Sequence, residues 1–513
     1  MRNVLRVAVF AAGTALLVQN ASADAWRREA AESLLARWCD ALEAYQVTDG
    51  LSDGAAVEFE LSAPSDAVTV TVEEKTIGRV KPLNAVNNGP AKARKSLSRQ
   101  NFDEFRAANI PYARTHDSAL RSACGGAHSV DITSVFPNFD ADENDPSSYD
   151  FLVTDGYLKA IQEAGCETFY RLGQSIEHTA RKYGTIPPKD FAKWARVCEH
   201  VIRHYNEGWA NGFRYDIKYW EIWNEPDLDK DDAKDKRTWG GTKAEFFAFY
   251  RTAARHLKSC FPHLKIGGPA SVCVARLDWM EDFLKEMARE PRVPLDFYSW
   301  HIYFDEIRKP VALAGEVRRL LDKYGYAETE SVHNEWNYRK DWSNAFVRDV
   351  QTWIGVKGAA LDAAAMCAMS RTSVDMMMYY DAAPDAVFNG LFDFYTRKPL
   401  PAYWAFFYWG DMLKKGTGLK VSIDGAANND VEAYAAVGRD GSKGLMVACY
   451  DDAVPLPDGV KTVVVRLPGN VRNLRLRLVD SKGANRSVPA VLSDGRVTLT
   501  LERLSVAYLT WTD

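Results

Sequence analysis

Apolar and polar positions change their spacing along the chain, and the changes divide it into regions. From residue 77 to residue 412, short β-type runs alternate with helical runs, of which Asp190 to Tyr205 is the clearest. Eight β-type runs alternating with helices predict a closed barrel of parallel strands rather than an open sheet. The predicted strands are 79–85, 112–115, 167–172, 217–223, 264–267, 295–302, 331–335 and 374–380.

The regions on either side of the barrel have a different pattern. Residues 413–513 contain short alternating strands separated by Gly, Asp, Pro and Ser, which predicts an all-β sandwich. Residues 24–76 predict a helix over 26–45 and two strands, 57–61 and 67–72, that we expect to join this β domain. The predicted fold is therefore α/β, a (β/α)8 TIM barrel over 77–412 with an accessory all-β sandwich. The sandwich is expected to support the barrel, and carbohydrate binding is the alternative.

The first residues have the pattern of a signal peptide. Arg2 and Arg6 precede an apolar run over 7–18, and Ala21-Ser22-Ala23 follows it. Cleavage is expected after Ala23, so that 1–23 is removed and the mature protein is secreted or periplasmic, with no membrane attachment. A membrane anchor is the alternative, although the run is short for a transmembrane span.

Composition narrows the classes of partner and cofactor. The chain has 513 residues, 47% of them hydrophobic, and a net charge of −5 without a basic stripe, which argues against a nucleic-acid partner. Its eight cysteines are scattered, with no Cys-x-x-Cys and no neighbouring His at ligand spacing, so a zinc site is not supported. We also expect no other metal and no cofactor. Disulfide pairing and oligomeric state do not follow from this pattern.

Two stretches end in the same way, each with a β-type run followed by Asn-Glu. They are Tyr219-Trp-Glu-Ile-Trp-Asn-Glu-Pro-Asp227 and Ser331-Val-His-Asn-Glu-Trp-Asn-Tyr338. In the first stretch, strict alternation would place Asn224 on the opposite side from Glu225. A carboxylate at the end of a buried strand suits a proton donor with a raised pKa. In a barrel, both Glu225 and Glu335 would lie at the carboxyl-terminal mouth, and such a facing pair is what cleavage of a glycosidic bond requires.

The run from Trp220 to Asp227, followed by Trp239-Gly-Gly-Thr242, resembles the acid/base segment of glycoside hydrolase family 39. This clan A family includes β-xylosidases and α-L-iduronidases, and the likeness covers roughly residues 81–403. It implies a retaining glycosidase with an oligo- or polysaccharide substrate. By the same likeness, Glu335 would be the nucleophile and Glu225 the acid and then the base.

The resemblance also implies ligands for the substrate. His116 and His301 would bind sugar hydroxyls, and Tyr303 would contact the nucleophile. Asn224 would hydrogen-bond the 2-hydroxyl group. From the residues themselves, we expect Arg114 to hold Glu335 ionised and Trp336 to form a stacking wall. Structural roles are the alternatives: a buried ion pair for Arg114, a turn-forming position for Asn224, satisfied core histidines, and a core position for Trp336.

Other acids near the second stretch are poorer nucleophiles by position. Glu328 and Glu330 precede Glu335 in the strand, and Asp296 begins the sixth strand, at the wrong end of the barrel. The loop after strand eight lacks the glutamate expected in β-xylosidase relatives, and Asp381 or Asp385 would have to replace it.

The predicted activity is therefore β-xylosidase-like or α-L-arabinofuranosidase-like, on plant or microbial polysaccharide ends. The alternatives are a noncatalytic polysaccharide-binding protein on the same barrel and a transglycosylase.

Overall fold

A computed structural model describes residues 67–93, 99–117, 128–272, 276–342, 346–425, 430–454 and 459–513. The predicted signal peptide, the helix over 26–45 and the strand over 57–61 lie outside these residues. Among the residues that are described, no helix is both long and apolar enough to cross a membrane. Five cysteines fall within the described ranges, and all five are free: Cys166, Cys198, Cys260, Cys367 and Cys449.

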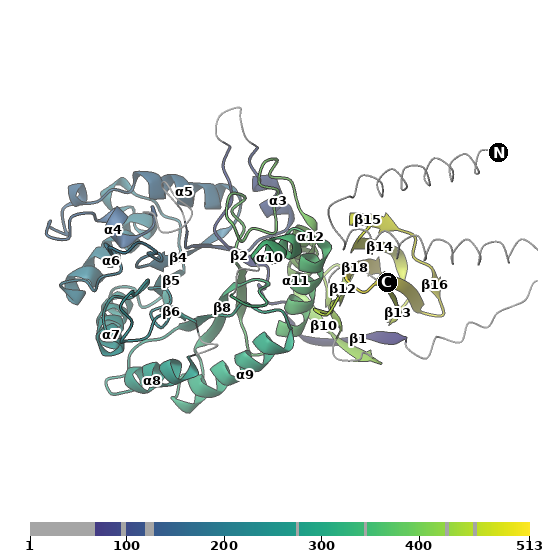
Figure 1. The fold of residues 1–513 in the computed structure, drawn as a ribbon. Coiled ribbons are helices and arrows are strands. Elements are labelled where there is room, and N and C mark those ends of the chain that lie inside the picture. The colour runs from purple at the N-terminus through teal and green to yellow at the C-terminus, as the bar shows by residue number, and fades with distance from the viewer. Residues whose placement is uncertain are drawn as a thin grey trace, which may run out of the picture. The chain divides into compact units, whose positions relative to one another are not determined.

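Eight parallel strands form a closed barrel, which confirms the predicted (β/α)8 fold, and helices surround it (Figure 1). The barrel closes where β9 pairs with β2, with Ala85 opposite Met378. The strands in order are β2 (Ala85–Asn87), β3 (Tyr112–Thr115), β4 (Glu167–Leu172), β5 (Tyr219–Ile222), β6 (Lys265–Ser271), β7 (Phe297–His301), β8 (Glu330–Trp336) and β9 (Met376–Tyr379).

The helices begin where their sequences supply caps. Asp190 accepts hydrogen bonds from the first turn of α6, and Thr242 forms a capping box with Glu245 at the start of α7. The helices are α3 (Phe102–Ala107), α4 (Ile132–Val135), α5 (Leu152–Glu163), α6 (Phe191–Asn206), α7 (Lys243–Cys260), α8 (Leu277–Met287), α9 (Arg308–Lys323), α10 (Phe346–Trp353), α11 (Val356–Met369) and α12 (Pro401–Lys415), with 3-10 turns η2 (Pro146–Ser148) and η3 (Trp209–Asn211).

The first barrel strand begins later than predicted. Residues 79–85 were expected to form it, but Arg79 ends β1 (Val68–Arg79), which belongs to the β domain, and the barrel strand starts only at Ala85. Pro82 lies between the two strands and has no N–H to donate, and a turn at Leu83 and Asn84 follows it. The predicted strand is therefore divided between two sheets, the β domain and the barrel.

The β domain is one continuous sheet of ten strands in the order β15-β14-β18-β12-β11-β10-β1-β13-β17-β16. A single apolar cluster contains Val463 and Leu499 from one end of this order and Leu476 from the other, so the sheet packs on itself as a sandwich does. Its remaining strands are β10 (Thr417–Asp424), β11 (Val431–Val437), β12 (Lys443–Cys449), β13 (Val460–Arg466), β14 (Arg472–Asp480), β15 (Gly483–Val488), β16 (Leu492–Ser493), β17 (Arg496–Glu502) and β18 (Ser505–Thr512).

Helix α12 of the barrel packs on this sheet with aromatic side chains. The ring of Trp409 stacks on Tyr434 at 4.9 Å and that of Tyr408 on Tyr508 at 4.6 Å. β1 pairs with β10 and β13, so the strand predicted over 67–72 lies in this sheet. The sheet therefore extends the apolar core of the barrel beside α12.

Candidate active site

The barrel interior is filled in layers, and the layers position the site. Apolar side chains from most of the strands, among them Phe169, Phe297 and Met378, form a plug at the amino-terminal end. Above this plug lie buried polar side chains, including Arg114 and Glu221, both without exposed surface. A dry floor of this kind strengthens electrostatic interactions among the groups that lie on it.

Arg114 connects the floor to the mouth. Its guanidinium donates to Glu221 Oε2 at 2.7 Å, to Asn87 Oδ1 at 2.9 Å and to Asn224 Oδ1 at 2.6 Å. The same guanidinium donates to Glu335 Oε2 at 3.3 Å. A buried acid therefore holds Arg114, as the structural alternative expected, and Arg114 also places positive charge beside Glu335.

Glu221 is a residue of the site for which the sequence analysis predicted no role. Its carboxylate accepts from Arg114 and, at 2.5 Å, from the side-chain amide of Asn334, so it fixes both side chains at the floor. Alternation along β5 was the signal that could have found it. Trp220 and Ile222 pack outward in the apolar core, so the acid between them faces the inside of the barrel.

Two residues just beyond β5 have positive φ angles, in the left-handed region, and this changes the direction of the side chains that follow the strand. Trp223 has φ 76° and Glu225 has φ 48°, a conformation that costs non-glycine residues roughly 1–3 kcal/mol each. The backbone of Glu225 is held there by hydrogen bonds to Ala270 and Thr238. The expected alternation is therefore wrong beyond β5, because Asn224 bonds Arg114 inside the barrel and Glu225 reaches the mouth as well.

The two glutamates meet at one histidine. His301 Nδ1 lies 2.7 Å from Glu225 Oε1 and 3.6 Å from Glu335 Oε2. One oxygen of each carboxylate and a ring nitrogen of His301 all lie within 4.8 Å of one another. Tyr303, two residues beyond β7, donates its hydroxyl to Glu335 Oε1 at 2.6 Å. The structure thus brings together Glu225, Glu335, His301, Tyr303, Asn224 and Arg114.

The contacts of the two carboxylates differ, and so do their expected protonation states. Burial raises the pKa of Glu225 to about 7, against the opposing charge of Arg114. Burial also raises the pKa of Glu335, but Arg114 and the Tyr303 hydroxyl oppose that rise. Glu335 accepts hydrogen bonds from both Arg114 and Tyr303, and these favour its ionised form. A single proton on the pair of carboxylates therefore belongs on Glu225. Burial lowers the pKa of His301 to about 4, so its imidazole is neutral near pH 7.

His116 lies on the other side of the mouth, beside a group that the sequence did not single out. Its Nε2 lies 3.8 Å from Asp117 Oδ1, and the Tyr380 hydroxyl donates to the Asp117 carboxylate. Burial, together with Arg114, lowers the pKa of His116 well below its usual value. Asp117 and Tyr380 are 263 positions apart in sequence, so no local pattern could have joined them.

Trp336 does not line the site. Its side chain has no exposed surface and packs against Phe304, Tyr379 and Phe406 in the layer between barrel and helices. The expectation of a stacking wall is therefore wrong, for the reason that neighbouring residues of a strand point to opposite sides and Glu335 points inward. An exposed indole does occur nearby at Trp342, whose ring meets Tyr303 edge-on at 5.3 Å.

Glu330 and Asp296 lie near the amino-terminal ends of their strands, as their positions predicted, whereas Glu328 lies outside the strand. Glu330 opens β8 and accepts from the Tyr219 hydroxyl at 3.0 Å, and Asp296 pairs with Lys258 at 2.7 Å before β7 begins. Glu328 is exposed ahead of β8.

Asp381 is buried after β9, in the loop where a substitute for the missing glutamate was expected. It accepts hydrogen bonds from Asn88 at 3.1 Å and from the Ala383 N–H at 2.8 Å. Its carboxyl group is therefore bound to the loops after β2 and β9. Asp385 lies in the same loop and is exposed.

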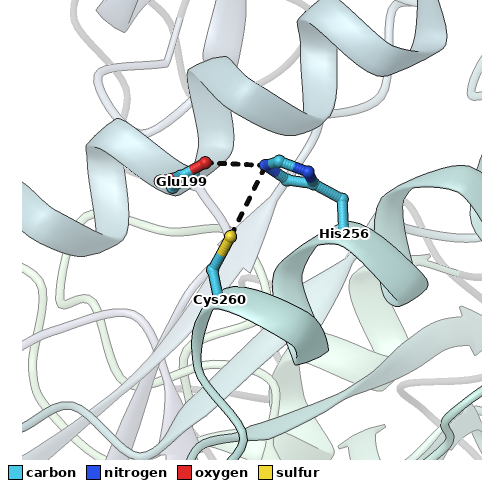
Figure 2. A group of neighbouring side chains, drawn as sticks. All are labelled: Glu199, His256 and Cys260. Atoms are coloured by element: carbon cyan, nitrogen blue, oxygen red, sulfur yellow. Dashed lines mark hydrogen bonds and ion pairs between the residues drawn. The ribbon is translucent and has the colours of Figure 1, made fainter.

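Two groups of described residues bring three ligand-type atoms within 4.8 Å, namely Glu225 with His301 and Glu335, and Glu199 with His256 and Cys260. Figure 2 shows the second group, which lies between α6 and α7 on the outside of the barrel. In each group a histidine nitrogen lies 2.7 Å from a carboxylate oxygen. Ligand atoms of a tetrahedral zinc site lie roughly 3.3–3.6 Å apart, so these contacts are direct hydrogen bonds, and we assign no metal to either group.

A parallel barrel with two carboxylates facing each other at its carboxyl-terminal mouth defines the class of the (β/α)8 glycoside hydrolases. Residues 100–337 match the family model described as Glycosyl hydrolases family 39. Over these residues the barrel of this chain is therefore similar to glycosyl hydrolase family 39.

Individual relatives agree with this similarity. Over 125 residues the chain is 40% identical to a β-xylosidase of Geobacillus stearothermophilus, which covers 24% of this chain and 22% of that protein. Over 166 residues it is 31% identical to a β-xylosidase of Caldicellulosiruptor saccharolyticus, covering 30% of this chain and 31% of that protein. The chain thus spans less than a third of the length of these curated relatives.

Among solved structures, a glucosidase from Croceicoccus marinus has the same fold, with a TM-score of 0.70 at 23% identity. That likeness covers 87% of this chain and 99% of the glucosidase, so it extends over both the barrel and the β domain.

Proposed function

We propose that the protein is an exported retaining glycoside hydrolase that cleaves terminal glycosidic bonds of plant or microbial polysaccharides. The observation that supports this most strongly is the pairing of Glu225 and Glu335 across His301, with carboxylate oxygens within 4.8 Å of each other. Retaining enzymes hold their two carboxyl groups about 5–5.5 Å apart and inverting enzymes about 6.5–9.5 Å apart. The short separation favours direct attack by a carboxylate over attack by an interposed water.

In the first step, a Glu335 oxygen attacks the anomeric carbon while Glu225 gives its proton to the departing glycosidic oxygen. The bond to the aglycone breaks, and a covalent glycosyl ester forms on Glu335. Arg114 and Tyr303 stabilise the ionised nucleophile beforehand, and the raised pKa of Glu225 keeps a proton available near neutral pH.

In the second step, the Glu225 carboxylate takes a proton from water as the water oxygen attacks the anomeric carbon. The ester bond to Glu335 breaks, and the sugar leaves with its original anomeric configuration. Asn224 is directed by Arg114 so that its amide can donate to the 2-hydroxyl group, and we assign the other sugar hydroxyls to His301 and His116. These contacts strengthen as charge develops at the anomeric centre.

The substrate class follows from the relatives rather than from the pair of glutamates. The curated relatives are named β-xylosidases, and we propose a β-xylosidase-like activity, with α-L-arabinofuranosidase-like activity as the second possibility. Arg2, Arg6 and the apolar run that follows support export through a cleavable signal peptide.

The test is hydrolysis of a panel of aryl glycosides by the wild type, by Glu335→Gln and by Glu225→Gln. We expect the wild type to release the aryl alcohol from a β-xyloside or an α-L-arabinofuranoside, and Glu335→Gln to release none. Equal rates for wild type and Glu335→Gln, or no hydrolysis by any of the three, would exclude a catalytic role. A product mixture dominated by transfer to an added alcohol would indicate a transglycosylase instead.

A further inference from the structure

A cavity of about 390 Å³ opens beside the catalytic pair, near the ends of β9, β2 and β3. Its walls are the loop 88–93 after β2, Asp117 after β3, one face of α5 and the loop 380–388 after β9. The volume falls within the usual range for small-molecule sites, about 300–1,000 Å³. Neither Glu225 nor Glu335 lines this cavity, so it is separate from the position where the bond is cleaved.

The cavity nevertheless begins one side chain away from the nucleophile. Tyr303, which bonds Glu335, has ring contacts with two lining residues, Phe388 at 5.6 Å and Tyr380 at 6.4 Å. A sugar ring held over Glu335 would therefore have its outer edge at the opening of the cavity.

The topology decides which part of the substrate the cavity faces. Glu225, the acid for the leaving group, follows β5 and is bonded to β6 through Ala270. In the closed strand order, β9 and β2 lie directly across the barrel from β5 and β6. The cavity is therefore on the side away from the leaving group, where the glycone of the substrate extends.

The lining chemistry suits a neutral sugar. Asp117 and Asp381 offer polar atoms, and the rings of Tyr157 and Tyr380 offer faces for apolar sugar surfaces. A sugar unit presents both kinds of surface, because its ring carries hydroxyl groups at the edge and C–H groups on the faces.

Two buried histidines lie beside the Asp117 carboxylate, which lines the cavity. His116 Nε2 lies 3.8 Å and His128 Nδ1 lies 3.9 Å from Asp117 Oδ1. These imidazoles pack against the inner side of the carboxylate that the cavity presents to a ligand.

The charged side chains of the cavity do not favour an acidic sugar. Lys92 lies 4.0 Å from Glu163, and Arg397 donates to two backbone carbonyls of the neighbouring loop, so both cations already have partners. The acids Asp117 and Asp385 would repel the carboxylate of a uronic acid.

We infer that this cavity binds a second neutral sugar unit, linked to the one held at Glu225 and Glu335, so that the protein releases a disaccharide in preference to a single sugar. This refines the proposed function, because the preferred bond is then the second from the chain end rather than the terminal one. The inference rests on the proposed function for its catalytic consequence. The binding of a disaccharide by the cavity can be measured without turnover.

Gly156 allows the cavity to be filled without disturbing the fold. It lies in α5 and lines the cavity, and a Cβ added there would meet no atom within 4 Å. Gly315 is a matched control, since it lies in α9, outside the cavity, and a Cβ there also meets nothing within 4 Å. Both Gly156→Phe and Gly315→Phe are compatible with a helix, because glycine is the poorer helix former.

The experiment compares kcat/KM for 4-nitrophenyl β-xyloside and β-xylobioside, and for the β-glucoside and β-cellobioside, in the full chain. We expect the wild type to favour the diglycoside of one pair at least ~10-fold, Gly156→Phe to lose that preference and Gly315→Phe to keep it. No preference in the wild type, or a preference unchanged in Gly156→Phe, would overturn the inference.

Calorimetric titration of Glu335→Gln, which should not hydrolyse them, with xylose, xylobiose, glucose and cellobiose separates this inference from the proposed function. Tighter binding of a disaccharide, abolished when Gly156→Phe is added, supports the second sugar position even if no glycoside is hydrolysed. Hydrolysis without any gain in affinity from the second sugar supports the proposed function and contradicts the inference.

Discussion

Replacing Tyr303 by Phe removes one hydroxyl group from the nucleophile and leaves the rest of the ring in place. The hydroxyl donates to Glu335 Oε1 at 2.6 Å, and burial raises the pKa of Tyr303 itself, so it remains a donor at all working pH values. A hydrogen bond to a charged group contributes about 1.5–3 kcal/mol, and one pKa unit corresponds to about 1.36 kcal/mol. The Tyr303→Phe substitution should therefore raise the pKa of Glu335 by about 1–2 units.

The sign of the effect follows from the role proposed for Glu335. The nucleophile must be ionised, so raising its pKa moves the acid limb of the kcat/KM profile upward by about 1–2 pH units and lowers activity roughly 10- to 100-fold below that limb. The alkaline limb, set by the Glu225 proton with a pKa of about 7, should stay in place.

The assay is hydrolysis of an aryl glycoside across a pH series that spans both limbs. Tyr326→Phe is the matched control, because it removes a buried hydroxyl that donates to the Val293 carbonyl at 3.0 Å, away from the site. An acid limb in Tyr303→Phe that coincides with those of the wild type and Tyr326→Phe would refute the assigned role of this hydrogen bond.

Three further substitutions or measurements follow from the same structure. Glu225→Gln should reduce kcat/KM about 10²–10⁴-fold on glycosides with poor leaving groups, with a much smaller loss for a dinitrophenyl glycoside and no alkaline limb near neutral pH; an equal loss on both substrates would contradict acid catalysis. Trp336→Ala should lower the free energy of unfolding by about 3–5 kcal/mol in denaturant titrations, whereas a normal stability with a raised KM would return Trp336 to the substrate site. Mass spectrometry of protein from the culture fluid or periplasm of its host should give a chain that begins at Asp24, and an intact Met1 would contradict signal cleavage.

The sequence carries enough information for the barrel and for its two glutamates. Each glutamate follows a short apolar run and an Asn, and once eight strands are counted, the ends of the fourth and seventh must share one mouth. The local side-chain directions were harder to predict. The alternation of side-chain directions does not continue beyond β5, because Trp223 and Glu225 have positive φ angles. For Trp336, the same alternation would have predicted a side chain that points away from the site, as the structure shows.

Local sequence patterns could not predict contacts between segments that are far apart in the chain. A replacement for the missing glutamate was expected only in the loop after strand eight, at Asp381 or Asp385. In the structure, Asp117 after β3 bonds Tyr380 after β9, and both line the cavity beside the pair. Such a pairing depends on how the barrel closes, which is set by the whole fold rather than by either segment.

The central claim is that Glu335 attacks the sugar while Glu225 supplies the proton. It is tested most directly by incubating the protein with an activated 2-deoxy-2-fluoro glycoside of the sugar it hydrolyses, followed by peptide mass spectrometry. A single fluoroglycosyl adduct on Glu335, formed in the wild type and absent from Glu335→Gln, is the predicted result. Turnover of the parent glycoside with an adduct on another residue, or with inverted product and no adduct at all, would contradict it.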